Sequence, residues 1–148
     1  MAENGIGLRQ ASVADCEFAY QTKKAALRKY VEMVWGWNEA EQRQMHERRF
    51  SAKDVKIVQL AGTDVGILAL VREADCLMIN QLFIVPKYQG RGIGRSCMMQ
   101  VIADAKRSSV PVRLWVLKVN TRAASFYDGL GFKEIGQNDT HIMMERTP

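Results

Sequence analysis

Near the middle of the chain lies a glycine-rich segment, Gln89-Gly90-Arg91-Gly92-Ile93-Gly94, between an apolar strand pattern and a helical pattern. Residues 77–85 before it are mostly apolar, and from Ile93 onward apolar residues recur every three or four positions. The start of a helix offers unpaired backbone N–H groups, and glycine lets those amides approach an anion closely. The segment therefore predicts a phosphate site, although glycines in a tight strand-to-helix connection would give the same pattern.

The spacing of the segment excludes the two most familiar phosphate-binding motifs. A P-loop needs a glycine where Gln89 stands, and a Lys where Arg95 follows Gly94. A Rossmann motif needs its third glycine at the position of Arg95 and an acidic residue about 20 residues further on. The strand expected at residues 112–116 contains no acid. Neither a P-loop nor a dinucleotide-binding fold is predicted.

The rest of the chain predicts an α+β fold with a central mixed, mostly antiparallel sheet of about seven strands and helices on both faces. Strands are expected at residues 6–10, 55–60, 65–71, 77–85, 112–116, 132–135 and 141–144, the one at 77–85 being the longest of the middle three. Helices are expected at about 12–34, 38–50, 93–108 and 121–130. Residues 61–64 are expected to form a hairpin turn. No repeat or linker divides the sequence, so residues 1–148 are predicted to be a single domain.

Local signals support the helix boundaries. Ser12 with Asp15, and Asn38 with Glu41, have the spacing of helix caps. Gly36 between them is suited to end the first helix in a left-handed conformation. The second helix has few apolar residues and is expected to be largely exposed.

Composition narrows the functional classes. The net charge of +5 suggests nucleic acid, but the basic residues are scattered and alternate with acids, so no nucleic-acid partner is predicted. Three widely spaced cysteines suggest neither disulfides nor zinc, and His46 and His141 lack partners at ligand spacing, so no metal is predicted. The first ten residues lack an apolar signal core and no apolar run could span a membrane. A cytoplasmic protein without membrane contact is expected.

Two sequence blocks closely resemble the GNAT superfamily of N-acetyltransferases. Residues 85–94 (VPKYQGRGIG) match the loop that binds the coenzyme A pyrophosphate in that superfamily. Residues 119–132 (VNTRAASFYDGLGF) match its segment ending in Tyr, two variable residues and Leu-Gly-Phe. The resemblance covers residues 77–132 and implies a GNAT-like fold with acetyl-CoA as the acetyl donor. Before residue 77 only the order of helices and strands supports it.

The resemblance implies a role for each matched position. Amides of residues 91–94 would hold the pyrophosphate, and the end of the preceding strand, splayed from its neighbour, would line the thioester, with an N–H near Val85 as oxyanion donor. Asn120 would bind the cofactor arm, or else cap a helix. Tyr127 would protonate the leaving thiolate, or else position the thiol or pack in the core. The predicted cofactor-binding residues are Phe83, Ile84, Val85, Gln89, Gly90, Arg91, Gly92, Ile93, Gly94, Arg95 and Asn120.

The acceptor site has a weaker signal. Glu32, Trp35 and Trp37 lie where the first two helices meet, a region that borders the acceptor pocket in the superfamily, and they could hold a cationic amine or simply pack. Asn80 and Gln81 interrupt the apolar strand and could line the acceptor site, relay a proton through water or make structural hydrogen bonds. The strand at 77–85 contains no carboxylate, so Glu32, Glu73 and Asp75 are the alternatives for a general base.

The sequence thus predicts an N-acetyltransferase that moves an acetyl group from acetyl-CoA to a primary amine of a small molecule or a peptide. The amine attacks directly, with Tyr127 as general acid. The predicted partners are acetyl-CoA and the amine acceptor, with a homodimer as a permitted assembly. The alternative is an acyl-CoA sensor or interaction module that keeps the phosphate loop without turnover.

Overall fold

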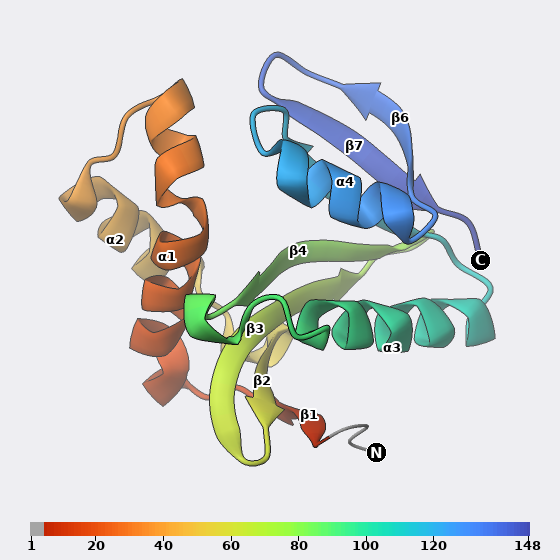
Figure 1. Ribbon diagram of the computed structural model, residues 1–148, viewed down its shortest axis with the longest axis horizontal. Helices are drawn as coiled ribbons and strands as arrows, with labels where there is room; N and C mark the ends of the chain where they lie inside the picture. Colours follow the sequence, from red (N-terminus) through yellow and green to blue (C-terminus); the bar gives the residue numbers. More distant parts are fainter. Residues whose placement is uncertain (1–4) are drawn as a thin grey trace. The chain divides into compact units, whose positions relative to one another are not determined.

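The structure, a computed structural model, describes residues 5–148, which form seven β-strands and four α-helices (Figure 1). The strands are β1 Ile6–Gln10, β2 Val55–Leu60, β3 Thr63–Arg72, β4 Leu77–Ile84, β5 Val112–Leu117, β6 Lys133–Gln137 and β7 His141–Arg146. The helices are α1 Cys16–Val34, α2 Glu39–Arg49, α3 Ile93–Arg107 and α4 Thr121–Gly129. Short 3₁₀ turns occur at Val13–Asp15, Ala52–Asp54 and, as η3, at Pro86–Tyr88.

The strands form one mixed sheet in the order β1-β2-β3-β4-β5-β7-β6. β4 and β5 are parallel, whereas β1 with β2, β2 with β3, β5 with β7 and β6 with β7 are antiparallel. The seven-stranded mixed sheet expected from the sequence is therefore confirmed. The chain divides into two compact units, one formed by residues up to Ala69 with Gln81–Cys97, the other by Leu70–Asn80 with Met98–Pro148.

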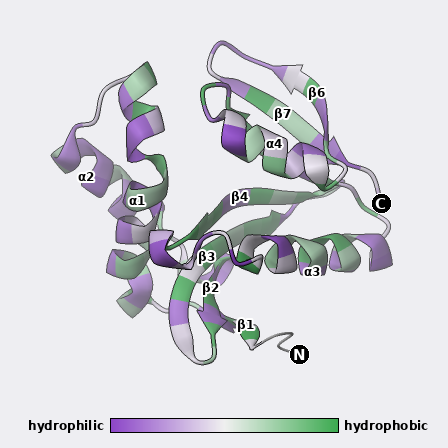
Figure 2. Ribbon diagram, viewed as in Figure 1, coloured by the Kyte–Doolittle hydropathy of each residue, from purple (hydrophilic) through white to green (hydrophobic). Residues whose placement is uncertain are grey.

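The first unit is built around the antiparallel strands β1, β2 and β3. Its core is a cluster of small and branched side chains, with phenylalanines such as Phe18 and Phe83 packed against it; the cluster comprises Ala11, Ala19, Val55, Ile57, Ile67 and Ala69. Figure 2 shows β3 mostly in hydrophobic colours and α2 mostly in hydrophilic ones. The exposure expected for α2 is found at most of its positions, but His46 is buried.

His46 ties α2 to α1. Its ring packs against Tyr20 and Phe50, with centroids 5.4 and 5.6 Å apart, and Nε2 lies 2.9 Å from the carbonyl oxygen of Cys16. Burial lowers the pKa of the imidazole, so the neutral ring is the form that fits this site. This explains why an otherwise polar helix stays attached to the unit.

The hairpin between β2 and β3 differs from the sequence expectation. Residues 61–64 were expected to form the turn, but β3 already begins at Thr63. Ala61 and Gly62 alone make the turn, with φ of 50° and 84°, as in a two-residue hairpin loop. β3 is consequently ten residues long and β4 eight, so β4 is not the longest of the three middle strands as predicted.

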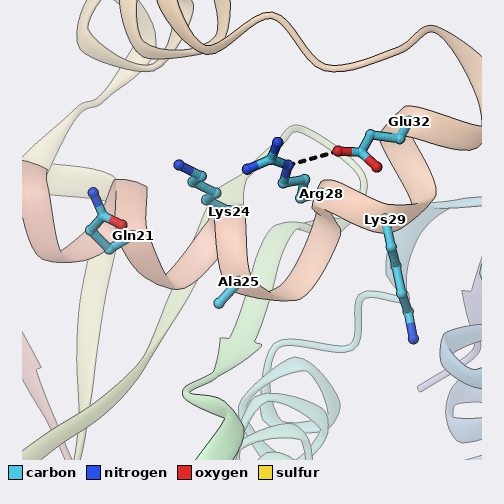
Figure 3. Close-up of a pocket in the computed structure, with 6 residues that line it drawn as sticks. All are labelled: Gln21, Lys24, Ala25, Arg28, Lys29 and Glu32. Carbon is cyan, nitrogen blue, oxygen red and sulfur yellow. Dashed lines mark hydrogen bonds and ion pairs between the residues drawn. The ribbon is translucent and has the colours of Figure 1, made fainter.

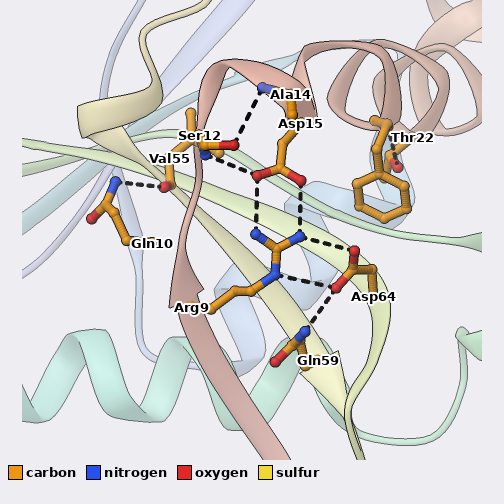
Figure 4. Close-up of polar contacts among 10 residues, drawn as sticks. Arg9, Gln10, Ser12, Ala14, Asp15, Thr22, Val55, Gln59 and Asp64 are labelled. Carbon is orange, nitrogen blue, oxygen red and sulfur yellow. Dashed lines mark hydrogen bonds and ion pairs between the residues drawn. The ribbon is translucent and has the colours of Figure 1, made fainter.

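A charged network joins β1, β3 and the start of the first helical segment (Figure 4). The guanidinium of Arg9 donates to both carboxylate oxygens of Asp15, at 3.0 and 2.8 Å, and to Asp64 at 2.9 Å. Asp15 also accepts from the backbone N–H of Ser12, which completes a capping box, and Gln59 donates to Asp64. The cap predicted at Ser12 and Asp15 is present, but it opens the 3₁₀ turn Val13–Asp15, and α1 begins only at Cys16. Arg9 links this cap to the sheet.

We expect Arg9→Met to lower the free energy of unfolding by about 2 kcal/mol at pH 7, because it leaves the mostly buried Asp15 carboxylate without its cation. Arg9 lowers the pKa of Asp15 and Asp64, so their contribution is present above the ordinary Asp pKa of about 3.9 and is lost below it. The difference between variant and wild type should therefore shrink as the pH falls below about 4. Urea unfolding at several pH values measures this.

Arg107→Met is the matched control, since Arg107 pairs with Asp104 on the exposed face of α3. Its effect should stay within about 0.5 kcal/mol. Equal losses for both variants would show that the Arg9 network contributes no more than a surface ion pair.

The second unit contains the antiparallel strands β5, β7 and β6, with α4 in contact with β5. Its buried side chains include Leu114, Val116, Met144 and Phe132, whereas β6 contributes none. The helix and strand boundaries lie within about two residues of the sequence expectation. Gly131, with φ of 93°, ends the α4 segment as predicted.

Within the described residues, neither a membrane-spanning helix nor a metal-binding cluster is found. No helix within residues 5–148 is long and apolar enough to cross a membrane. No group of three or more His, Cys, Asp or Glu side chains in that range could hold a metal ion. The expectation drawn from the first ten residues falls partly on residues 1–4, which lie outside the described part.

Candidate active site

The glycine segment forms the turn into α3. Gly90 and Gly92 have φ of 77° and 79°, a left-handed conformation that favours glycine, and a Cβ added to either would meet open space. The first helical hydrogen bond runs from the N–H of Ser96 to the carbonyl of Gly92, at 3.0 Å. The amides of residues 93–95 therefore precede the first helical donor and have no partner within the helix. This is the backbone arrangement that suits an anion.

Gln89 fixes the turn to the end of β4. Its side-chain amide donates to the carbonyl of Ile84 at 2.9 Å, and the N–H of Tyr88 donates to the carbonyl of Val85 at 2.9 Å. The Gln89 side chain therefore holds the loop against the strand. The cofactor-binding role predicted for Gln89 stays a prediction.

The turn is strongly basic. Lys87 and Arg91 both lie over the ring of Tyr88, at 5.2 and 5.1 Å from its centroid, and Arg95 is exposed in the first turn of α3. The sequence contains no acidic residue between Asp75 and Asp104. In the described chain none of these three cations forms an ion pair, unlike Arg9 or Arg113. The local field therefore favours an anionic ligand.

The end of β4 combines apolar character with exposure. All of residues 82–85 are only half-buried, although they form one of the most apolar runs of the chain. The N–H of Val85 donates to the carbonyl of Val65 in β3 at 2.8 Å, so this N–H is not available to a ligand. Backbone groups alternate sides along a strand, so those of Ile84 point away from β3. Ile84 N–H is therefore the nearest candidate for the expected oxyanion donor.

The parallel pairing of β4 with β5 is short. Leu77, Met78 and Ile79 pair with Val112, Arg113 and Leu114, and the register ends there although both strands continue. A parallel ladder that stops leaves backbone donors and acceptors without strand partners. Such groups are what the expected pantetheine contacts require.

Asn120 caps α4 in the second unit. Its side-chain oxygen accepts from the N–H of Ala123 at 3.1 Å, and its carbonyl accepts from Ala124. The capping alternative for Asn120 is therefore what the structure shows. The side-chain NH₂ group takes no part in the cap and can still donate to a ligand.

Tyr127 lies in α4 with its ring between Phe126 and Phe132, at centroid distances of 5.1 and 5.5 Å. The residue is 9% exposed, and burial raises the pKa of its phenol to about 12. The Tyr127 hydroxyl makes no hydrogen bond within residues 5–148. Every fully buried side-chain oxygen in that range does have a hydrogen-bond partner. The hydroxyl oxygen must therefore reach the surface, while the ring is held by packing.

The five residues predicted for the acceptor site have different surroundings. Glu32 pairs with Arg28 at 2.7 Å, and the indole N–H of Trp37 donates to Glu39 at 3.0 Å. Trp35 is 59% exposed. Asn80 is exposed and Gln81 is half-buried. Asn80 belongs to the second unit, whereas Gln81 belongs to the first unit together with Glu32, Trp35 and Trp37.

Sequence reasoning missed two positions that shape these segments. Glu39 accepts hydrogen bonds from Tyr20, Lys24 and Trp37, which lowers its pKa to about 2, with Lys24 as the largest cause. Gly66 lies so close to β4 that an added Cβ would be 2.5 Å from the carbonyl oxygen of Phe83. A lone glycine in an apolar strand is a signal of close backbone approach and could have revealed the second position.

Comparison with known proteins identifies the family of the chain. The family model for the acetyltransferase (GNAT) domain matches residues 51–134, so the chain belongs to the GNAT acetyltransferase family. A curated N-acetyltransferase of Methanocaldococcus jannaschii is 34% identical over 80 residues, 53% of this chain and 35% of that protein. One of Archaeoglobus fulgidus is 30% identical over 81 residues, 49% of this chain and 55% of that protein. The match thus spans about a third of the M. jannaschii protein and about half of the A. fulgidus protein.

Solved structures share the fold. The PaiA N-acetyltransferase of Thermoplasma acidophilum, solved in complex with coenzyme A, matches over 100% of both chains with a TM-score of 0.79 at 19% identity. At that identity the similarity establishes the fold alone. It confirms the GNAT fold expected from the sequence.

Proposed function

We propose that this protein is an N-acetyltransferase that transfers the acetyl group of acetyl-CoA to a primary amine of a small molecule or a peptide. One observation carries the proposal: a basic turn with two left-handed glycines places unpaired helix amides beside open space at the start of α3. Family membership and the coenzyme A bound in the PaiA structure support the same donor. We also propose one acetyltransferase domain, since the family match includes residues of both compact units.

In this proposal the chain holds the donor mainly through its backbone. The amides of residues 93–95 bind the pyrophosphate, with Arg91 and Arg95 supplying positive charge. The half-buried residues 82–85 line the pantetheine and the thioester, and the side-chain NH₂ of Asn120 donates to the cofactor arm. Gln89 keeps the turn attached to β4.

The transfer is a direct attack. The neutral amine forms a C–N bond with the thioester carbonyl, and the carbonyl oxygen gains negative charge that the N–H of Ile84 stabilises. The C–S bond then breaks, the amine loses a proton to a base, and the departing thiolate takes the proton of Tyr127. The base releases its proton to water, and the Tyr127 phenolate takes one back from water, so both groups are restored. The products are an N-acetylated amine and free coenzyme A. With a pKa of about 12 the phenol stays protonated at neutral pH, and a thiolate leaving into an apolar site is itself made more basic.

A second candidate is an acyl-CoA sensor that binds the donor without turnover. Residues 77–85 contain no carboxylate, whereas many members of the superfamily carry a carboxylate base on this strand. This difference favours the sensor. Acetyl-CoA consumption measured with polyamines, amino acids, aminoglycosides and peptides separates the two candidates. Tight acetyl-CoA binding without turnover on any acceptor would select the sensor.

Replacing Gly92 by Asn should weaken acetyl-CoA binding by about tenfold or more while the fold persists. Asn tolerates the left-handed conformation, so the loss would arise from a side chain in the space beside the amides. Calorimetric titration with acetyl-CoA measures the affinity. Gly62→Asn is the matched control, because Gly62 has φ of 84° and equally open surroundings in the β2–β3 turn. Unchanged affinity for Gly92→Asn would remove the pyrophosphate from this turn.

A further inference from the structure

A groove of about 420 Å³ runs along one face of α1, with a lining rich in cations (Figure 3). Its walls are side chains spaced three or four residues apart on the helix: Gln21, Lys24, Ala25, Arg28, Lys29 and Glu32. Three of the six are basic and one is acidic. The groove therefore differs from the acidic and aromatic site expected for a cationic amine.

The carboxylates at the groove already have partners. One oxygen of Glu39 accepts from Lys24 at 2.7 Å and from the indole of Trp37, and its other oxygen accepts from the hydroxyl of Tyr20. Glu32 accepts from Nε of Arg28 at 2.7 Å. An incoming ammonium group would have to displace one of these donors.

The donors at the groove are not exhausted. Arg28 uses only Nε toward Glu32, and no hydrogen bond from its terminal nitrogens is found in the described chain. Figure 3 shows these nitrogens on the side facing Lys24, while Lys29 points away. Lys24 and Arg28 are one helical turn apart, so their like charges repel. The ion pairs with Glu39 and Glu32 already offset that repulsion, and an anion held by both cations would receive charge-assisted hydrogen bonds from the donors that remain.

We propose that Lys24 and Arg28 bind an anionic group of the acceptor, so that the substrate is an amine carrying a carboxylate or a phosphate. This inference rests on the proposed N-acetyltransferase function and specifies its acceptor class. The ion pairs to Glu39 and Glu32 keep the two cations in place, and Arg28 is further held over the Trp37 ring, 5.9 Å from its centroid. The site is thus arranged before the acceptor arrives.

Matched acceptor pairs provide the kinetic test. Amino acids are compared with their amides, and phosphoethanolamine with ethanolamine, so that carboxylate and phosphate are assessed separately. The charged member of at least one pair should have the higher kcat/KM, by about tenfold, as expected for a charge-assisted hydrogen bond. Arg28→Gln should remove most of that preference. Arg107→Gln, which removes an exposed arginine paired with Asp104 on α3, should leave it unchanged.

Site-resolved NMR provides a test that does not need turnover. Inorganic phosphate and acetate are titrated separately into ¹⁵N-labelled protein. Shifts at α1 amides from Lys24 to Glu32, lost in Arg28→Gln and kept in Arg107→Gln, would support the anion site. Shifts confined to residues 90–95 would overturn it, because the anion would then bind only at the glycine turn.

The outcomes separate this inference from the proposed function. Equal kcat/KM for charged and neutral acceptors, with Arg28→Gln behaving like the control, overturns the acceptor class and leaves the enzyme intact. A higher KM for acetyl-CoA in Arg28→Gln, with unchanged acceptor preference, also overturns it and assigns the anion to the donor. Absence of turnover on every acceptor contradicts the proposed function, and the NMR titration then still decides whether the groove binds anions.

Discussion

We expect Tyr127→Phe to lower kcat by about 10²- to 10⁴-fold with acetyl-CoA affinity nearly unchanged, the loss typical of a missing general acid. The variant removes one oxygen and keeps the ring that packs between Phe126 and Phe132. The hydroxyl makes no hydrogen bond in the described chain, so its removal leaves no buried group without a partner. Thermal stability should therefore stay close to that of the wild type, which is the internal control.

The pH dependence tests the same role. Because burial raises the pKa of Tyr127 to about 12, the phenol stays protonated throughout a pH range of about 6 to 10. The drop in kcat should be of similar size across that range. A parallel loss of acetyl-CoA affinity would mean that the hydroxyl only positions the thiol. Wild-type kcat in the variant would exclude Tyr127 as an essential acid.

Much of the fold could be predicted because its signals are local. The caps at Ser12 and Asn38 and the helix stop at Gly36 depend on residues within three positions of each other, and each is found as expected. The glycine turn before α3 is also a local pattern. Strand and helix boundaries follow from periodicity, which needs no knowledge of the distant chain.

The sequence predictions that were wrong or missing depend on contacts between residues far apart in the chain. Thr63 and Asp64 looked like turn residues because they are polar, yet Asp64 is a strand residue whose charge is matched by Arg9, 55 positions away. The cluster around Glu39 needs donors from α1 and from the segment after it, so no local pattern reveals it. Asn120 shows a further limit, since a cap and a ligand-binding amide have the same sequence signal.

The end of β4 is set in position by Gly66 of β3. A Cβ at residue 66 would lie 2.5 Å from the carbonyl oxygen of Phe83 and 2.8 Å from the Ile84 side chain. The register of β2 with β3 shifts beside Gly66, as at a β-bulge. The missing side chain therefore lets β3 approach the backbone that we propose lines the thioester.

Gly66→Ala should consequently lower the free energy of unfolding by about 2 to 3 kcal/mol, because the backbone of Phe83 must move to admit the methyl group. Gly136→Ala is the matched control: Gly136 is also a strand glycine, but an added Cβ there meets no atom within 4 Å. That variant should be neutral or stabilised by about 0.5 kcal/mol, through a less flexible unfolded chain. Urea unfolding gives both values, and calorimetry with acetyl-CoA shows whether displaced strand backbone also weakens donor binding. Equal stability of the two alanine variants would mean that β4 does not depend on the close approach at Gly66.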